Sequence, residues 1–581
     1  MIRDFFRVLE VDLSQKKARL HKIDGRDEFI GGSGLCALLF SRFGKVNEPW
    51  DDPMQPLIFA IGPLTGYFPL MSKTICAFKS PYNNQYTESH GGGRSALSLR
   101  FSDLDAFVIT GCSSEPVVVA IGSNDVEFVK ADFLWGLDVI QTGKIVRKMF
   151  HRAKGHRSIL RIGPAGERKS AISCINVDTY RHFGRLGAGA VMGHKKLKAI
   201  VIQGDASFPL PETRSYKKAY KEVFEDIIGS GMMKKYHDLG TPANIKRLND
   251  LKSLPWRNLL STSDNEIEKI SGEVFADDHL LRNLACSGCP IGCIHVGYFR
   301  EKFMKDHRYF FEQVAYDYEP IFATGSMLGI TKPAEILKLI FKSDEMGLDV
   351  ISAGVALAWA TEAFKREIIS IRETIVPLNF GDSKRYLEAM EYLAKAQNDF
   401  YASLSKGTLY AASIYGGQEF ACVLGQEMAG YATGELFFVA QSLGFRHSHL
   451  DVGAYSYEQK YDDKDLDKHI DFLLKDEVKR VFLNCMVACL FSRGVYTTER
   501  LKRCLESTGY NNIAENIEAL SEKIRKDRWK LRFSSGFNPD DISIPKRFYK
   551  VVSWKGPVDK GYLERLKKEY GRRLKRLVLN E

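Results

Sequence analysis

Residues 181–200 read RHFGRLGAGAVMGHKKLKAI, a glycine-rich stretch that ends in an apolar run and closes the β-rich part of the chain. Short apolar runs bounded by glycine-rich turns predict β-strands. Such runs cover residues 57–61, 106–109, 117–121 and 199–202. Near the start, Leu9, Val11 and Leu13 alternate with polar residues and are followed by a polar turn, which predicts a hairpin.

The pattern changes at Pro209-Leu210-Pro211. Beyond it, apolar residues recur at helical spacing, first over residues 216–228 and again over 336–340 and 513–524. The basic segment 560–576 also carries apolar residues at helical spacing, which favours an amphipathic helix over a nucleic-acid-binding arm. We therefore expect an α+β protein, with a β-rich domain at residues 1–208 and two mainly helical domains at 209–420 and 421–581.

Length and composition exclude several classes of protein. A chain of 581 residues exceeds what one hydrophobic core organises, and 44% hydrophobic with 27% charged residues is typical of a folded protein. The net charge of +11 permits a nucleic-acid partner but does not indicate one. The charged start resembles no signal peptide, and the best membrane-span candidate, residues 351–363, is too short. We expect a cytoplasmic protein that binds neither nucleic acid nor membrane.

Three of the eleven cysteines form the motif Cys286-x-x-Cys289-x-x-x-Cys293. Three thiolates this close converge on one centre if the backbone turns around it, which Pro290 and Gly292 favour. Zinc would add a further thiolate or an imidazole such as His295, whereas an iron–sulfur cube would add a fourth thiolate from a remote part of the chain. Spacing alone leaves both open. Candidates for the remote thiolate are Cys485 and Cys489, which would share one face if they lay on a single helix.

Two glycine-rich loops also carry basic residues. One contains Arg181, Gly184 and Arg185, and the other covers residues 88–94, with Lys73 shortly before it. Neither has the spacing of a P-loop or of a dinucleotide-binding loop. Guanidinium groups beside free backbone amides suit phosphate oxygens, so these loops are consistent with a large phosphorylated cofactor, although such loops are more often plain tight turns.

The chain resembles the aldehyde ferredoxin oxidoreductase family of tungsten enzymes from near residue 5 to at least residue 500. The resemblance rests on IGPLTG (61–66), KSP (79–81), ESHGG (88–92), IGPAGE (162–167), residues 181–200, the Cys286 motif, DEMGLD (344–349) and the Cys489 segment, which follow the family's order. It implies an amino-terminal domain of two β-sheets that carries a bis-pterin tungsten cofactor, with two helical domains closing over it.

The resemblance also implies roles for individual residues. Cys286, Cys289, Cys293 and Cys489 match the ligands of a [4Fe-4S] cluster, while Cys485 does not match and should be structural. A magnesium ion would be bound by the main-chain carbonyls of His90 and His182. The contacts with the pterins and their phosphates map to Lys73, His90, Gly92, Arg181, His182, Gly184, Arg185, Asp344, Leu348, Asp349, Ala488 and Leu490.

Several positions depart from the family's pattern. Lys73 stands where Arg is common, which replaces a forked contact by a point charge. His90 and His182 stand where Asn and Ala are usual, and Asn484 replaces an expected Asp. Lys338 stands where a carboxylate would bind the iron that joins subunits in some members, so a dimer of that kind is not expected.

Glu319 and His449 match positions associated with the family's substrate pocket. A carboxylate and an imidazole there would orient substrate and move protons while an aldehyde is oxidised to a carboxylic acid. Residues 430–434 and 446–451 resemble instead a subgroup that includes the tungsten subunit of class II benzoyl-CoA reductase. Reduction of an aromatic acyl-CoA is therefore the alternative to aldehyde oxidation.

Partners also follow from this resemblance. The expected electron acceptor is ferredoxin or a small ferredoxin-like iron–sulfur subunit, which would suit the basic balance of the chain. A zinc-stabilised binding protein is a third interpretation, which leaves residues 181–200 and 344–349 unexplained.

Overall fold

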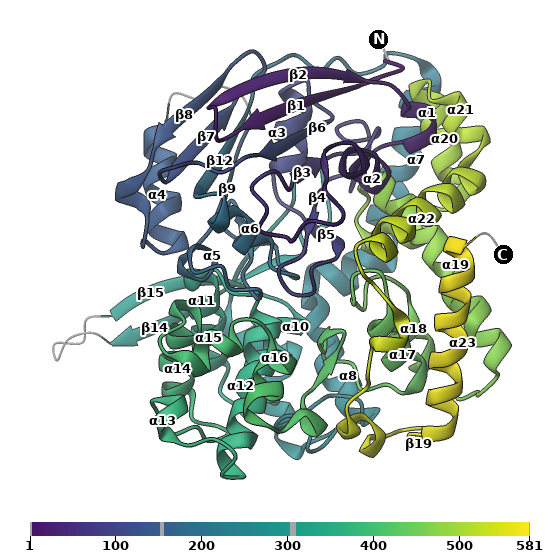
Figure 1. Cartoon of the computed structure of the whole chain (residues 1–581). Helices are drawn as coiled ribbons and strands as arrows, with labels where there is room; N and C mark the ends of the chain where they lie inside the picture. Colours follow the sequence, from purple (N-terminus) through teal and green to yellow (C-terminus); the bar gives the residue numbers. More distant parts are fainter. Residues whose placement is uncertain (1–2, 152–155, 303–308, 580–581) are drawn as a thin grey trace.

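The computed structural model describes residues 3–151, 156–302 and 309–579. Two six-stranded mixed sheets form the amino-terminal part, as Figure 1 shows at the top of the molecule. The first has the order β2-β1-β6-β3-β4-β5 and the second β11-β10-β9-β12-β7-β8. Their strands are β1 (Phe6–Asp12), β2 (Lys17–Ile23), β3 (Leu57–Ala60), β4 (Thr74–Lys79), β5 (Tyr86–Gly91), β6 (Ala106–Thr110), β7 (Val117–Ile121), β8 (Val126–Lys130), β9 (His156–Arg161), β10 (Ile175–Val177), β11 (Arg181–Phe183) and β12 (Leu197–Gly204). The two sheets, the four predicted apolar runs and the hairpin of β1 and β2 are thereby confirmed.

Strand β3 shows why these runs are apolar throughout. Leu57 and Phe59 pack into the core between the two sheets, while Ile58 and Ala60 pack into the core beneath the helices. Side chains alternate between the faces of a strand, so a strand covered on both faces needs apolar residues at every position. The helices of this part are α1 (Arg26–Phe29), α2 (Gly32–Phe43), α3 (Ser95–Phe101), α4 (Val139–Met149), α5 (Pro164–Glu167) and α6 (Ala188–His194).

The remainder of the chain is mainly helical, as expected, and lies below the sheets and to their right in Figure 1. Its central helix α12 (Val350–Lys365) is buried along almost its whole length, which explains the apolar run that is too short for a membrane span. Helices α10 (Tyr318–Thr324), α11 (Pro333–Met346), α14 (Ser383–Lys395) and α16 (Thr408–Tyr415) pack against it. The same part of the chain contains α7 (Arg214–Gly229), α8 (Asn244–Asp250) and α15 (Asp399–Leu404). No helix of the described ranges is both long and apolar enough to cross a membrane.

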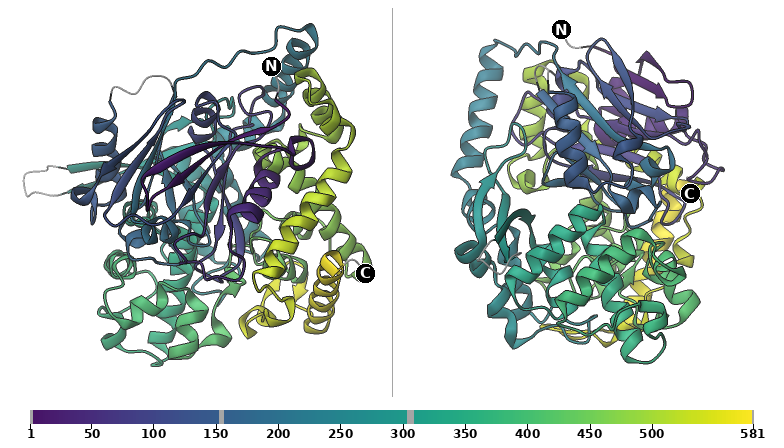
Figure 2. Two further views of the ribbon diagram at one scale, coloured as in Figure 1. Left: turned by 45° about the horizontal axis from the view of Figure 1, so that its top comes forward. Right: turned by 90° about the vertical axis from the view of Figure 1, so that its left-hand side faces the viewer.

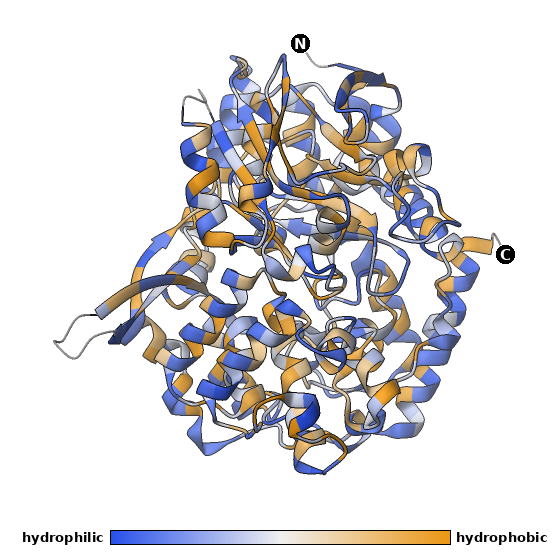
Figure 3. Ribbon diagram, turned by 60° about the vertical axis from the view of Figure 1, so that its left-hand side comes forward, coloured by the Kyte–Doolittle hydropathy of each residue, from blue (hydrophilic) through white to orange (hydrophobic). Residues whose placement is uncertain are grey.

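The last part of the chain packs long helices along one side of the molecule, which Figure 2 shows from two further directions. These are α17 (Glu435–Leu443), α18 (Ala454–Glu458), α19 (Leu466–Cys485), α20 (Thr498–Thr508), α21 (Asn511–Glu515), α22 (Ile517–Ser534) and α23 (Lys560–Leu579). Helix α23 is amphipathic as predicted: Tyr562, Leu563, Leu566 and Tyr570 are buried, and Figure 3 shows hydrophilic and hydrophobic residues interspersed along it.

A three-stranded antiparallel sheet in the middle of the chain was not expected from the sequence. It consists of β13 (Leu280–Leu284), β14 (Ile294–Lys302) and β15 (Tyr309–Tyr316). The Cys286 motif lies in the loop from β13 to β14, so this sheet fixes both ends of the loop. Its other end projects from the body of the molecule (Figures 1 and 2).

Candidate cofactor and substrate cavity

One cavity of about 440 Å³ brings together residues from all three parts of the chain. It is lined by Lys73, His90, Arg181, His182, Gly184, Arg185, Cys286, Cys289, Cys293, Glu319, Asp344, Leu348, Asp349, His449, Ala488, Cys489 and Leu490. Gly92 lies directly behind this lining, since a Cβ atom built on it would come 2.9 Å from the Cys286 sulfur. Every site residue expected from the sequence is thus placed in or against a single cavity.

The four thiols meet because Leu70 connects their two loops. Its backbone N–H donates to the carbonyl of Gly288 at 3.2 Å, and its carbonyl accepts from the N–H of Cys489 at 2.9 Å. Gly288 and Gly292 have φ values of 69° and 66°, which glycine adopts without the strain that a side chain would add. These two glycines allow the tight turn that holds Cys286, Cys289 and Cys293 around one side of the cavity.

The idea that Cys485 and Cys489 share one helical face was wrong. Helix α19 ends at Cys485, and Val487 takes a left-handed conformation with φ of 53°. Cys489 therefore lies beyond the helix and points into the cavity, while Cys485 is fully buried and does not line it. This agrees with the structural role expected for Cys485.

Two cations lie against the thiols. Arg181 Nη2 is 3.9 Å from the Cys293 sulfur, and Arg181 Nη1 donates to Asp317 at 3.2 Å. Burial raises the pKa of the Cys286 thiol, but Arg181 and Lys73 outweigh this and bring the pKa below its ordinary value. Burial dominates for Cys289 and raises its pKa to about 12. Within the set of four thiols, the positive charge is thus concentrated near Cys286 rather than near Cys289.

This arrangement does not suit a single small ion. Among the residues that the structure describes, no three His, Cys, Asp or Glu side chains are close enough to hold one metal ion. His295, considered as a zinc ligand, is fully buried and its Nε2 lies 2.8 Å from the carbonyl of His237. Neither the thiols nor His295 therefore form a site for a single zinc ion in the described part of the chain.

In another part of the cavity, a carboxylate, an imidazole and a phenol form one group. Glu319 Oε1 lies 3.1 Å from His449 Nε2 and accepts a hydrogen bond from Tyr431 at 2.8 Å. Burial raises the pKa of Glu319, but the bonds from His449 and Tyr431 outweigh it and leave the pKa below its ordinary value. His449 Nδ1 is buried and has no hydrogen-bond partner among the described residues. This nitrogen is available to a bound molecule.

Tyr431 and Asp317 belong to the site but were not identified from the sequence. Both lie beside residues that were identified, Tyr431 bonding to Glu319 and Asp317 bonding to Arg181. Asp317 was visible as the second residue before Glu319, yet its contact with Arg181 spans 136 positions of sequence and has no local signal.

The basic loops contribute buried donors to the cavity. Arg185 contacts Asp349 at 3.3 Å and donates to the carbonyl of Glu427 at 2.6 Å, which fixes the guanidinium. Its Nη1, like the Nε of Arg181, is buried without a hydrogen-bond partner in the described part of the chain. Gly184 faces open space, because a Cβ atom there would meet nothing within 4 Å. Donors held this way are ready for an anionic group.

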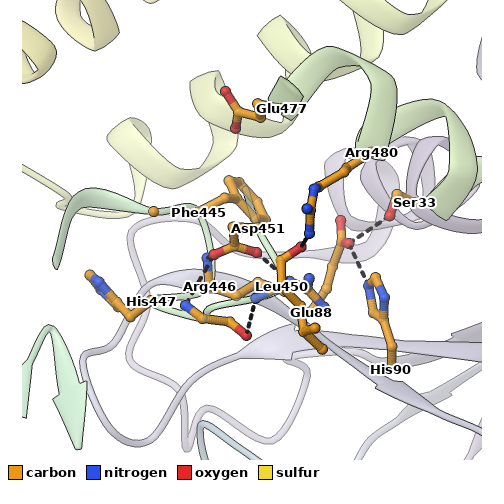
Figure 4. Close-up of polar contacts among 12 residues, drawn as sticks. Ser33, Glu88, His90, Phe445, Arg446, His447, Leu450, Asp451, Glu477 and Arg480 are labelled. Atoms are coloured by element: carbon orange, nitrogen blue, oxygen red, sulfur yellow. Dashed lines mark hydrogen bonds and ion pairs between the residues drawn. The ribbon is translucent and has the colours of Figure 1, made fainter. Parts of the chain in front are cut away.

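Behind the cavity, buried ion pairs connect the sheets to the carboxy-terminal helices. Arg528 donates to both oxygens of Glu88 at 2.7 and 3.0 Å, and Ser33 and His90 contact the same carboxylate. Figure 4 shows Ser33 and His90 pointing toward Glu88, with Arg446 and Asp451 facing one another nearby. Burial and the charge of Arg446 lower the pKa of His90 to about 4, so its ring is neutral at pH 7.

His447, two positions before His449, does not line the cavity. Its Nδ1 lies 2.8 Å from the carbonyl of Ser442, and its Nε2 lies 2.6 Å from Arg532 Nη2. It is therefore a structural residue of the buried frame.

Comparison with known proteins assigns the chain to a protein family. The model of the aldehyde ferredoxin oxidoreductase amino-terminal domain matches residues 8–204, and that of domains 2 and 3 matches residues 218–574. The chain belongs to the aldehyde ferredoxin oxidoreductase family, a family of oxidoreductases.

Similar curated proteins include the "Tungsten-containing aldehyde ferredoxin oxidoreductase" of Thermococcus kodakarensis, which is 29% identical over 98% of this chain and 95% of its own length. The "Aliphatic sulfonate oxidoreductase, WOR-like subunit" of Pyrococcus furiosus is 30% identical over 70% of this chain and 66% of its own. Among solved structures, "Active site complex BamBC of Benzoyl Coenzyme A reductase in complex with 1,5 Dienoyl-CoA" matches with a TM-score of 0.81 at 18% identity, covering 98% of this chain and 95% of that one. This last likeness shows the shared fold.

Proposed function

We propose that this chain is a cytoplasmic tungsten enzyme that oxidises aldehydes to carboxylic acids and passes the electrons through a [4Fe-4S] cluster to ferredoxin or a ferredoxin-like subunit. The observation that carries the proposal is the joint presence, on one cavity, of four thiols and the Glu319–His449 pair. The full-length relatives named as tungsten-containing aldehyde ferredoxin oxidoreductases support it.

The residues present fit a bis-pterin tungsten cofactor. The unpartnered donors of Arg181 and Arg185 suit pterin phosphates, and the open space at Gly184 leaves room for them to approach the backbone. When bound, this group accepts the electron pair that the aldehyde loses. Strands β5 and β11 are edge strands of the two sheets and lie side by side, so the carbonyls of His90 and His182 fall on neighbouring edges, as magnesium ligation by both would need.

Glu319 and His449 would handle protons and position the substrate. Glu319 stays ionised at neutral pH because its two hydrogen-bond partners outweigh its burial. Its oxygen holds His449 Nε2, which leaves Nδ1 to accept or donate a proton at the substrate. Tyr431 donates a hydrogen bond to the same Glu319 oxygen and helps to hold the carboxylate in place.

Cys286, Cys289, Cys293 and Cys489 would hold the cluster. Lys73 and Arg181 would offset part of its negative charge; that both lower the pKa of the Cys286 thiol supports this. The net charge of +11 would attract an acidic electron acceptor. A small partner subunit is consistent with the relative that is named as a subunit.

The alternative is reduction of an aromatic acyl-CoA at the same cofactor. The resemblance of residues 430–434 and 446–451 to that subgroup favours it, as does the fold shared with the benzoyl-CoA reductase complex. In that reaction the electrons would run from the cluster to the substrate, and the cavity would need to admit a CoA ester.

Anaerobic purification with metal, sulfide and pterin analysis tests the proposal. We expect tungsten, pterin and about four iron and four sulfide per chain, together with ferredoxin-coupled oxidation of aldehydes. Reduction of benzoyl-CoA without aldehyde oxidation would favour the alternative. Zinc in place of iron, with no pterin, would contradict both.

A further inference from the structure

A group of unpaired cations stands at the solvent end of the cavity. Lys235 and Arg493 are both exposed, and both line the cavity that also contains Glu319 and His449. Lys235 lies on a π-helical segment, Met233–Leu239, and such segments occur frequently at functional sites. Arg493 follows Cys489 by four residues, and its Nη1 donates to the carbonyl of Leu490 at 2.9 Å.

No carboxylate neutralises these two side chains among the described residues. The ammonium of Lys235 lies 5.4 Å from the ring centroid of Tyr236, and the charge of Arg493 lies close enough to the same tyrosine to act on its pKa. The pKa of Lys235 is lowered by partial burial and then by three further cations, Arg493, Arg247 and Lys460. Arg247 bonds to the neutral side chain of Gln459, which also lines the cavity. Lys246, the residue before Arg247, does have a carboxylate partner and forms an ion pair with Glu268.

An aromatic wall links these cations to the interior. The rings of Tyr236 and Phe491 stack with centroids 4.0 Å apart and planes 4° apart, and both side chains line the cavity. Tyr236 is next to Lys235 in sequence, and Phe491 is two residues before Arg493. The aromatic wall therefore has positive charge at its outer end and apolar surface along its length. Like charges held close together repel one another and destabilise the folded protein, and a bound anion would offset this repulsion.

We propose that Lys235 and Arg493 form a binding subsite for an anionic group at the far end of the substrate, so that the enzyme prefers aldehydes that carry a second, negatively charged group. The substrate's apolar segment packs on Tyr236 and Phe491, while its carbonyl reaches Glu319 and His449. The proposal rests on the proposed function for the reaction, but the anion-binding subsite itself does not depend on it. A carboxylate and the phosphates of a CoA ester share the required chemistry.

The kinetic test compares two aldehydes of equal length, 6-oxohexanoate and hexanal, in the anaerobic holoenzyme. Lys235→Gln and Arg493→Gln should each raise KM for 6-oxohexanoate about tenfold, the value of one charged hydrogen bond, and leave KM for hexanal within about twofold. Lys234→Gln is the matched control, because Lys234 is exposed on the same segment and does not line the cavity. It should change neither value.

Several results would overturn the subsite. Equal changes in KM for both aldehydes would show general damage to the cavity. A rise in KM for ferredoxin, with both aldehydes unchanged, would show that the cations bind the protein partner instead. A wild-type preference for hexanal would also contradict the proposal.

An equilibrium measurement separates failure of the subsite from failure of the proposed reaction. Isothermal titration with hexanedioate should show binding that hexane-1,6-diol lacks and that the double variant Lys235→Gln/Arg493→Gln loses. This result would support the subsite even if no aldehyde were oxidised. Binding of CoA but not hexanedioate, lost in the same variant, would identify the anion as phosphate. No binding of either anion would overturn the proposal.

Discussion

The thiol end and the acid–base end of the cavity manage charge in opposite ways. At the thiol end, Lys73 and Arg181 lie close to Cys286, Cys293 and Cys489, and the carboxylate of Asp317 balances only part of their positive charge. At the other end, His449 and Tyr431 both bond to Glu319 and balance its charge, while His449 Nδ1 has no partner among the described residues. The thiol end therefore has a surplus of positive charge that suits an anionic group, whereas the charge of Glu319 is balanced within the acid–base end. Substitutions at the two ends should have separable effects.

The largest effect is expected at the thiol end. Cys289→Ser removes one of four ligands, and even second-shell partners of a metal cost about 10- to 100-fold when they are lost. We expect loss of the cluster's iron and sulfide and a fall of at least about a hundredfold in ferredoxin-coupled turnover. Iron analysis and the absorption band of the cluster measure the first, and the coupled assay measures the second.

Cys485→Ser is the matched control for this variant. Cys485 is a buried thiol at the end of α19, four positions before Cys489, and it does not line the cavity. Its replacement should leave iron content unchanged. If Cys289→Ser retained its full complement of iron, the ligand assignment would be wrong.

A smaller and chemically different effect is expected at the acid–base end. His449→Ala removes the buried Nδ1 that has no partner among the described residues and that we propose as the proton carrier. Loss of a general acid or base costs about 10²- to 10⁴-fold in rate. Tungsten and iron content should stay at the wild-type level, because no thiol or basic loop is altered. Turnover and metal content are measured on the same preparation.

Tyr431→Phe sharpens this comparison. It keeps the ring and removes only the hydroxyl that bonds to Glu319, so its effect on turnover should be well below that of His449→Ala.

Two results for His449→Ala would contradict these expectations. Loss of metal in His449→Ala would show that the two ends are not independent. Wild-type turnover in the same variant would remove His449 from the mechanism.

The sequence predicted the parts of the molecule whose signals are local. The strands buried on both faces, the hairpin of β1 and β2 and the amphipathic helix α23 each have a pattern within one short segment. The sheet of β13, β14 and β15 was missed, although β15 reads YFFEQVAY and its aromatic residues favour a strand. The interrupted helix at Val487 was missed because nothing in the residue type demands a left-handed conformation there.

The residues of the site divide in the same way, into those with a local sequence signal and those without one. The thiols and basic loops were found because they form motifs, and their family order carried the remaining assignments. The contact of Arg181 with Asp317 and the grouping of Lys235 with Arg493 join elements far apart in the chain. Such neighbours depend on tertiary packing, so neither spacing nor composition contains them.

The smallest expected effect concerns the frame behind the cavity. Burial and the charge of Arg532 lower the pKa of His447 to about 3, so its ring stays neutral in the folded protein. The unfolded chain takes up a proton below about pH 6.5, which the folded protein does not. This group therefore lowers the free energy of unfolding as pH falls, by about 2 kcal/mol between pH 7 and pH 5.

His447→Asn should remove that part of the pH dependence. Asn tolerates the left-handed conformation of this residue, φ 50°, and retains a donor for the carbonyl of Ser442. Between pH 7 and pH 5, the free energy of unfolding measured in urea under anaerobic conditions should fall by about 2 kcal/mol less in the variant than in the wild type. His151→Asn, at an exposed histidine, should match wild type. An unchanged pH dependence in His447→Asn would mean that His447 is protonated in the folded state, and the buried frame would then carry one more positive charge beside Arg532.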